Sequence, residues 1–313
     1  MKNLFPVILI VLLFGCQNIA KDGQTVILKN EYIKVEAKKT GAELISIKLL
    51  EDDIEYLWQG DSLTWSDHAI VQFPIIGNLK NDQYRYNGKQ YGMMSHGFAR
   101  ISDFEVVEKS NEKVIFQLKS SSSTQKIYPF DFVFRVSYIL KEDSIFVIFD
   151  VENTGNDIMY FSLGYHPGFN WPIGQDETMG DHYLEFSHSE SVDRLVMNEN
   201  LIDSLQRNFL SGTKKIELDK DLFQDDVVIL AGIKSESLGL KNTKNQRSVT
   251  VTFGEVPYLG IWSPKKNGDF VCIEPWFGVP DWNNASGELE KKEGIIDLVP
   301  SDHYQWECKI TIQ

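Results

Sequence analysis

One histidine of this sequence lies where a strand would present it to a ligand. Apolar residues alternate with smaller or more polar residues in the segment before His166. The apolar residues are Met159, Phe161, Leu163 and Tyr165, and the others are Tyr160, Ser162 and Gly164. Alternate side chains of a strand point to opposite faces, so His166 would share the polar face. Because Pro167 cannot donate to a ladder, we expect the strand to end at the histidine. His166 is a candidate acid–base residue at a sheet rim, although a surface histidine before a turn fits equally well.

A carboxylate ends an apolar run in the last part of the chain. Glu274 follows residues 270–273 and precedes Pro275 and Trp276. A carboxyl group between a buried strand and aromatic rings would be partly desolvated, which raises its pKa and makes it a better general base near neutral pH. On this pattern alone, a glutamate that turns from the strand end into solvent would be the commoner case.

A third candidate group combines His96 with Gly97 and Arg100. Gly97 would allow a ligand to approach the backbone closely, or an unusual backbone angle. Arg100 could bind oxygen atoms through two hydrogen bonds, or it could cap a surface turn. The faces of tryptophan side chains can stack on sugar rings, although we expect most tryptophans here to be packing residues. The chain has seven of them: Trp58, Trp65, Trp171, Trp262, Trp276, Trp282 and Trp306.

The sequence gives no pattern of metal ligands. His182 and His188 lie in a turn-rich segment without a ligand spacing, and three cysteines are too few and too scattered for a zinc site or a disulfide scaffold. Cys272 and Cys308 fall within strand patterns, and we expect them to be packing residues.

The elements that must position these residues read as strands. Period-two alternation is clearest at 130–141, 145–151, 248–253 and 304–312, and shorter apolar runs lie at 33–37, 114–118, 227–233 and 270–273. No segment has a sustained apolar stripe with helical spacing, and one turn of helix is expected within 219–226. The pattern predicts an all-β protein, a large antiparallel β-sandwich in a single domain over residues 25–313.

Composition excludes several classes of function. The 313 residues are 42% hydrophobic, enough for one large core or at most two domains. Lys and Arg number 31 against 45 Asp and Glu, which gives a net charge of −14. Such a surface repels phosphate backbones, so nucleic acid is not expected as a partner.

The amino-terminal residues are typical of an export signal. An apolar run at 4–14 is too short to span a membrane and ends at Gly15 and Cys16, which resembles the lipobox of bacterial lipoproteins. We expect a signal peptide over 1–15, acylation of Cys16, and a polar tether over 16–24. An ordinary secretory signal is the alternative. The lipid on Cys16 would anchor an exported protein to a membrane, on its periplasmic or cell-surface side.

Four segments together resemble a known family. They are Phe-Pro-Ile-Ile-Gly at 73–77, His-Gly-Phe-Ala-Arg at 96–100, Gly-Tyr-His-Pro-Gly-Phe at 164–169 and Ile-Glu-Pro-Trp at 273–276. In this order and at these separations they resemble the aldose 1-epimerase (galactose mutarotase-like) family, in particular its LacX-like branch. The resemblance implies a large β-sandwich that interconverts the α and β anomers of an aldose, with no metal or nucleotide cofactor.

The resemblance also implies roles for particular residues. Glu274 would be the base at the C1 hydroxyl, His166 the acid at the ring oxygen on the other side of the acetal, and His96 would hold and polarise that oxygen. A nearby Glu274 carboxylate would favour the protonated form of His166. The implied substrate-binding residues are Arg100, Trp276, Asn78, where many relatives carry Arg, and Asp226, with Asp225 as the alternative.

Other functions remain open on the sequence. A non-catalytic carbohydrate-binding module on the same fold would lose the acid–base pair, which this chain keeps. A hexose-6-phosphate 1-epimerase is a second alternative because of Arg100, but the upstream Arg-Gly-Gly motif of that branch is absent and the net charge favours a free aldose. A glycoside hydrolase would need a second carboxylate, for which Asp281 is the nearest residue. A structural lipoprotein without a ligand is the remaining possibility.

Overall fold

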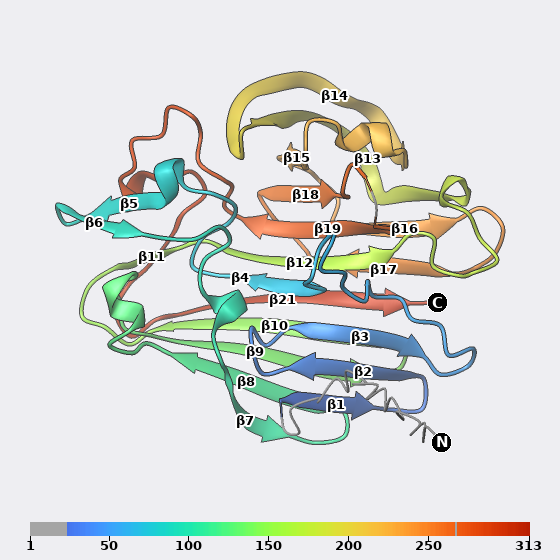
Figure 1. The fold of residues 1–313 in the computed structure, drawn as a ribbon, viewed down its shortest axis with the longest axis horizontal. Helices are drawn as coiled ribbons and strands as arrows, with labels where there is room; N and C mark the ends of the chain where they lie inside the picture. Colours follow the sequence, from blue (N-terminus) through green and yellow to red (C-terminus); the bar gives the residue numbers. More distant parts are fainter. Residues whose placement is uncertain (1–23, 267) are drawn as a thin grey trace, which may run out of the picture.

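The computed structural model describes residues 24–266 and 268–313. One antiparallel sheet of fourteen strands dominates it (Figure 1). Its order is β4 (Ala69–Gln72), β12 (Leu163–Asn170), β19 (Phe270–Phe277), β18 (Tyr258–Trp262), β15 (Val228–Ala231), β13 (His182–Asn198), β16 (Ser237–Asn242), β17 (Ser248–Thr252), β21 (His303–Ile312), β10 (Ser144–Asn153), β9 (Phe132–Lys141), β8 (Lys113–Lys119) and β7 (Glu105–Lys109), with β14 (Leu201–Glu217) paired to β13.

Three smaller sheets and six short 3₁₀ helices complete the described part of the chain. The sheets are β1 (Thr25–Lys29), β2 (Ile33–Lys38) and β3 (Leu44–Leu49); β5 (Gln83–Tyr86) and β6 (Lys89–Gly92); and β11 (Met159–Phe161) with β20 (Ile296–Leu298). The helices are η1 (Lys80–Asp82), η2 (Ala99–Ile101), η3 (Thr124–Lys126), η4 (Met179–Asp181), η5 (Lys220–Phe223) and η6 (Leu289–Lys291).

The predicted all-β architecture is confirmed, and so are the strands with the clearest alternation. In β10, for example, Ile145, Val147, Phe149 and Val151 are fully buried. Burial of one face removes apolar surface from water while the other face stays polar, which is the reason for the period of two. The single helical turn expected within 219–226 is η5.

The three-stranded sheet packs against the large one. Val35 of β2, Phe116 of β8 and Tyr138 of β9 belong to one continuous hydrophobic core. The Tyr138 hydroxyl donates to the carbonyl of Ala42 at 2.7 Å, in the connection between β2 and β3. The two layers therefore share apolar contacts and a buried hydrogen bond, as a sandwich requires.

The expected end of a strand at His166 is wrong. β12 continues through Pro167 to Asn170. Pro167 is the last residue of β12 that pairs with β4, and pairing with β19 resumes at Gly168. Pairing with β19 is missing from Tyr165 to Pro167, whereas β4 pairs with β12 up to Pro167, so the strand passes the proline without ending. The alternation around it is as expected, because Met159, Phe161, Leu163 and Tyr165 are all fully buried.

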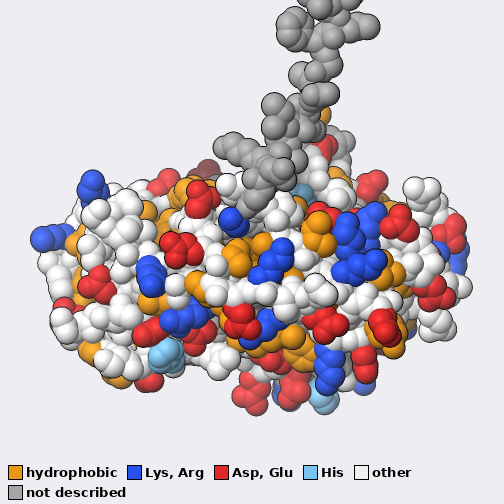
Figure 2. All heavy atoms as spheres, turned by 90° about the horizontal axis from the view of Figure 1, so that it is seen from below, with side chains coloured by type: hydrophobic (Ala, Val, Ile, Leu, Met, Phe, Trp, Pro, Cys, Tyr) orange, Lys and Arg blue, Asp and Glu red, His pale blue; other side chains and the backbone are white. Residues whose placement is uncertain are grey.

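Charged side chains are mixed on the face of the molecule that Figure 2 shows. Acidic and basic groups are interspersed there, so the net charge of −14 is not gathered into one patch on that face. No described helix is long and apolar enough to cross a membrane. The export signal, Cys16 and all but the last residue of the tether lie outside the described residues and stay predictions.

Candidate active site

Strand register brings His166 and Glu274 together. The pairs Gly164↔Trp276 and Gly168↔Cys272 join β12 to β19 and place His166 and Glu274 midway between them. Residues that face each other on adjacent strands point to the same side of the sheet. Nε2 of His166 accordingly lies 3.1 Å from Oε2 of Glu274. Two residues more than a hundred positions apart in sequence thus form one acid–base pair.

The pair is almost completely removed from water. Exposed fractions are 7% for His166 and 1% for Glu274. Burial raises the pKa of Glu274 well above its usual value, and the charge of Asp226 adds to this effect. Burial also lowers the pKa of His166 well below its usual value. In the unliganded site the neutral forms are therefore favoured, with the proton on the carboxyl group, which differs from the imidazolium expected from the sequence.

His96 is held in one tautomer. Its Nδ1 accepts the backbone N–H of Gly77 at 3.2 Å and lies 2.7 Å from the side-chain nitrogen of Gln72. Because the Gly77 N–H can only donate, Nδ1 must be unprotonated and the ring proton must be on Nε2. Burial, together with the charge of Arg100, lowers the pKa of His96 to about 3. At neutral pH His96 is thus an uncharged hydrogen-bond donor through Nε2.

The backbone at His96 and Gly97 is left-handed, with φ of 62° and 73°. A Cβ on Gly97 would lie 2.2 Å from the carbonyl oxygen of Phe73. The unusual backbone angle expected as one use of Gly97 is therefore confirmed, and its close neighbour is the backbone of Phe73. This turn carries His96 against His166, whose ring centroid lies 5.6 Å away in an edge-on arrangement.

These side chains line a cavity of about 210 Å³. Three aromatic walls enclose it, Trp65, Trp262 and Trp276, and Trp65 stacks on His166 with ring centroids 5.0 Å apart. The remaining lining residues are Gly77, Asn78, His96, His166, Met197, Asn200, Asp226, Val227, Glu274 and Pro280. Of the residues predicted from sequence, the structure brings together His96, His166, Glu274, Asn78, Asp226 and Trp276.

Three other predicted or considered residues lie elsewhere. Arg100 does not line the cavity, and its Nη2 contacts Oδ2 of Asp67. Asp225 is mostly exposed, so of the two aspartates Asp226 is the one at the site. Asp281 is bound by the ammonium group of Lys292 at 2.8 Å and by the backbone N–H of Lys80. It is not a second carboxylate across the cavity from Glu274.

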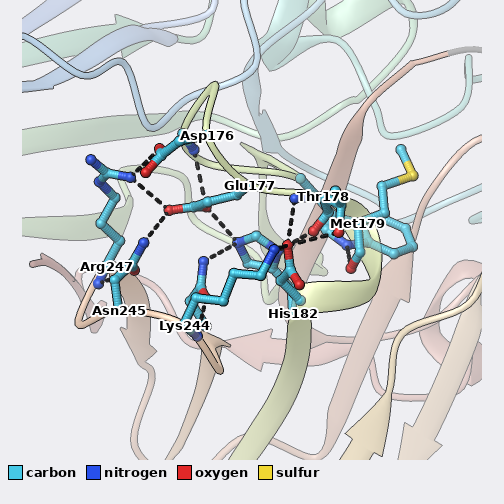
Figure 3. Close-up of polar contacts among 12 residues, drawn as sticks. Asp176, Glu177, Thr178, Met179, His182, Lys244, Asn245 and Arg247 are labelled. Carbon is cyan, nitrogen blue, oxygen red and sulfur yellow. Dashed lines mark hydrogen bonds and ion pairs between the residues drawn. The ribbon is translucent and has the colours of Figure 1, made fainter.

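His182 belongs to a separate buried cluster, which Figure 3 shows. Its Nε2 lies 3.0 Å from Oε2 of Glu177, and Oε1 of Glu177 accepts hydrogen bonds from Arg247 and Asn245. The cluster ties the connection between β12 and β13 to the connection between β16 and β17. The histidine is therefore part of a structural ion-pair network away from the cavity.

The sequence has relatives over nearly its whole length. The profile of the family described as aldose 1-epimerase matches residues 24–296. The chain belongs to the aldose 1-epimerase family. Two LacX proteins of Lactococcus lactis subsp. lactis, one plasmid-encoded and one chromosomal, are each 35% identical to it over 298 residues, which cover 92% of this chain and 99% of each relative.

Solved structures of similar proteins share the fold. A galactose mutarotase related enzyme from Lactobacillus acidophilus is 38% identical, with a TM-score of 0.86 over 92% of this chain and 97% of that one. A galactose mutarotase-like protein from Lactobacillus casei ATCC 334 is 30% identical, with a TM-score of 0.87 over 92% of this chain and all of the other. The galactose mutarotase-like fold is thereby shown for this aldose epimerase family member.

Several residues at or beside the cavity were not predicted from the sequence. Gln72 ends β4 with no local pattern to mark it, and Asn200 lies at the tip of the long β13–β14 hairpin. Cys272 was expected to be a packing residue, yet its sulfur, a nitrogen of His166 and an oxygen of Glu274 all lie within 4.8 Å of one another. Its position two residues before Glu274 in a strand was the available signal, because residues i and i+2 share a face.

Proposed function

We propose that this protein is an aldose 1-epimerase that interconverts the α and β anomers of a free aldose. The observation that carries the proposal is the 3.1 Å contact between His166 and Glu274 at a cavity walled by tryptophans. Mutarotation requires a proton to leave the C1 hydroxyl while the ring oxygen gains one. Both oxygens are bonded to the same carbon, so an acid and a base that lie side by side match the spacing of the two reacting atoms.

The ring opens by transfer of two protons. Ionised Glu274 accepts the proton of the C1 hydroxyl, the C1–O5 bond breaks, and protonated His166 donates to O5 as C1 becomes a carbonyl carbon. Sugar binding must therefore recruit the charged form of the pair, and the sugar oxygens stabilise that form by hydrogen bonding. After opening, Glu274 holds the proton and His166 is neutral, which is the protonation state that burial favours in the empty site.

Reclosure returns the pair to its starting state. The C1–C2 bond rotates, O5 attacks the other face of the carbonyl carbon, and His166 recovers a proton from O5 while Glu274 returns one to O1. Each residue ends the cycle as it began, so the pair needs no external proton source. His96, fixed with its proton on Nε2, supports the reaction as a neutral donor to the ring oxygen.

The lining of the cavity favours a free sugar over a sugar phosphate. Among the described residues, the lining contains two carboxylates, Glu274 and Asp226, and neither lysine nor arginine. Arg100, the residue that suggested a phosphate, contacts Asp67 instead. A phosphorylated ligand would therefore meet repulsion at the cavity and no charged partner within its lining.

The test is NMR exchange between the α and β anomers of glucose, galactose, xylose and glucose 6-phosphate. Wild type should accelerate the exchange, and Glu274→Gln and His166→Asn should each lower it by about 10²–10⁴-fold. Glu190→Gln is the matched control. Glu190 is another fully buried glutamate, and its carboxylate accepts hydrogen bonds from the backbone N–H groups of Lys234 and Ser235, outside the cavity. Sugar-dependent shift changes without exchange would instead identify a carbohydrate-binding module, and exchange restricted to glucose 6-phosphate would identify the phosphate-specific epimerase.

A further inference from the structure

Cys272 adds a third metal-binding side chain to the acid–base pair. It lies two residues before Glu274 on β19 and pairs with Gly168, two residues after His166 on β12. One nitrogen of His166, the sulfur of Cys272 and one carboxylate oxygen of Glu274 all lie within 4.8 Å of one another, and all three residues are buried. We propose that these residues form an inhibitory site for a divalent transition-metal ion, of which Zn²⁺ is the best match.

The donor set is the reason for choosing zinc. Imidazole, thiolate and carboxylate are the side chains that bind Zn²⁺, usually in a tetrahedral arrangement with bonds of about 2.0–2.3 Å. Such bonds place the ligand atoms about 3.3–3.8 Å apart, so closure of the site shortens the distances between them by at most about 1.5 Å. Mg²⁺ and Ca²⁺ prefer oxygen ligands alone, and a site with one sulfur and one nitrogen excludes them.

The polar atoms of the cluster are unsatisfied without an ion. In the described part of the chain, Nδ1 of His166 and both carboxylate oxygens of Glu274 are buried and have no hydrogen-bond partner apart from the His166–Glu274 contact. Buried polar atoms are normally paired, so these atoms indicate a place prepared for a ligand. Either a sugar, from the cavity side, or a metal ion would satisfy them.

The cavity gives an ion access to the cluster from the sugar side. His166 and Glu274 line the cavity, whereas Cys272 does not, and Trp65 packs against the strand beside it. Asp226 lines the same cavity and adds a second negative charge at the entrance. On binding, the Cys272 thiol and the Glu274 carboxyl group each release a proton to solvent as the metal–sulfur and metal–oxygen bonds form. The fourth position of the ion then faces the cavity.

Metal and sugar chemistry are mutually exclusive at this site. The lone pairs of His166 and Glu274 that bind the ion are those that carry the protons during ring opening. We therefore expect Zn²⁺ to inhibit anomer exchange and sugar to protect against this inhibition. This consequence rests on the proposed function. Formation of the metal site itself is measured independently of activity.

The experiment titrates CoCl₂ into the Cys16→Ser protein, so that Cys272 and Cys308 are the remaining thiols. A thiolate–cobalt charge-transfer band should appear, and ZnCl₂ should abolish it. Cys272→Ala should lose the band. Cys308→Ala should keep it and is the matched control, because Cys308 is an equally buried thiol on β21 outside the cluster. Cys272→Ser preserves the side-chain size in case Ala prevents folding, and it should also lose the band.

Activity gives the second readout. The Zn²⁺ concentration for half-inhibition should rise by about 10-fold or more in Cys272→Ser, since even the hydrogen-bond partners of metal ligands change affinity by about 10–100-fold. Absence of the cobalt band, or its persistence in Cys272→Ala, would overturn the proposed site. A cobalt band in a protein that exchanges no anomers would support the metal site while rejecting the epimerase, so the two failures are separable.

Discussion

His96 and Gly77 are joined by two hydrogen bonds that run in opposite directions. The backbone N–H of Gly77 donates to Nδ1 of His96, and the backbone N–H of His96 donates to the carbonyl of Gly77 at 3.0 Å. The first of these determines the tautomer, and the second fixes the distance between the two segments. A neutral histidine whose proton must be on Nε2 is a donor that cannot become an acceptor, which is what a developing oxyanion requires.

Gln72 should matter for catalysis although it does not line the cavity. Its side-chain nitrogen lies 2.7 Å from Nδ1 of His96, so Gln72→Leu removes a donor that holds the ring. We expect kcat to fall by about 5- to 10-fold, the equivalent of one hydrogen bond of about 1 kcal/mol, with little change in KM. NMR of ¹⁵N-labelled histidine should show a shifted Nδ1 signal of His96 in this variant, while the tautomer stays the same because the Gly77 N–H still donates to Nδ1.

Gln72→Glu distinguishes this positioning role from simple packing. A carboxylate at the same place favours the protonated ring, so the pKa of His96 should rise from about 3. Activity should then depend on the protonation of His96, and the histidine NMR signals should titrate with it. An unchanged Nδ1 signal of His96 in both Gln72 variants would contradict the assigned role. Gln90→Leu, at an exposed glutamine of β6, is the control.

The backbone turn at His96 is a second feature that a pair of glycine variants can isolate. Gly97 and Gly88 have nearly the same φ, 73° and 71°, but a Cβ would meet the Phe73 carbonyl at Gly97 and nothing within 4 Å at Gly88. Gly88→Ala should cost about 1–2 kcal/mol from the left-handed backbone alone. Gly97→Ala should cost more than this in urea denaturation and should also lower activity, because the clash displaces His96. Equal losses of stability in the two variants would show that the close approach of Gly97 to Phe73 does not contribute to the free energy of unfolding.

The sequence predicted those parts of the fold and site that depend on short stretches of chain. Alternation within β10 and β21 marked them as half-buried strands, and the same alternation put His166 on the polar face. Glu274 was recognisable because an apolar run and two aromatic residues surround it. These signals are local, since burial of one face imposes the period of two on each strand separately.

What could not be predicted arises from pairing between distant strands. Nothing near Gln72 shows that β4 lies beside β12, which is the pairing that brings Gln72 to the site. Passage of β12 through Pro167 depends equally on its neighbours, since β4 pairs with the strand up to Pro167 and β19 pairs with it again from Gly168. The lowered pKa of His166 in the empty site could not be expected from the sequence, because its burial is a property of the packed cavity.

Asn78 offers a test of sugar binding apart from catalysis. It lines the cavity, and its Oδ1 accepts a hydrogen bond from Ser95 at 3.1 Å, which orients the amide. Loss of an uncharged contact that is equal in the ground and transition states raises KM and leaves kcat unchanged. We expect Asn78→Ala to raise KM by about 5- to 10-fold, as for one neutral hydrogen bond. A fall in kcat at constant KM would place Asn78 at the reacting atoms instead.

The buried cluster of Figure 3 should stabilise the fold through Glu177. Burial alone would raise the pKa of Glu177, but hydrogen bonds from Arg247, Asn245 and the backbone of Gly174 lower it to about 2. The lowered pKa means that ionised Glu177 stabilises the folded state above about pH 4.5 and that this contribution is lost as the pH falls towards 2. Glu177→Gln should therefore lower the free energy of unfolding by about 1–3 kcal/mol at neutral pH, and by less near pH 2.

Asp176 provides the matched control for that variant. It also accepts a hydrogen bond from Nη1 of Arg247, at 2.6 Å, but its side chain is 70% exposed against 1% for Glu177. Exposed ion pairs contribute about 0–1 kcal/mol, so Asp176→Asn should change stability little at any pH. Urea denaturation at neutral pH and near pH 2 measures both variants. Equal destabilisation by the two would contradict the assignment, because the two carboxylates share the guanidinium group, and burial and the additional hydrogen bonds of Glu177 distinguish them.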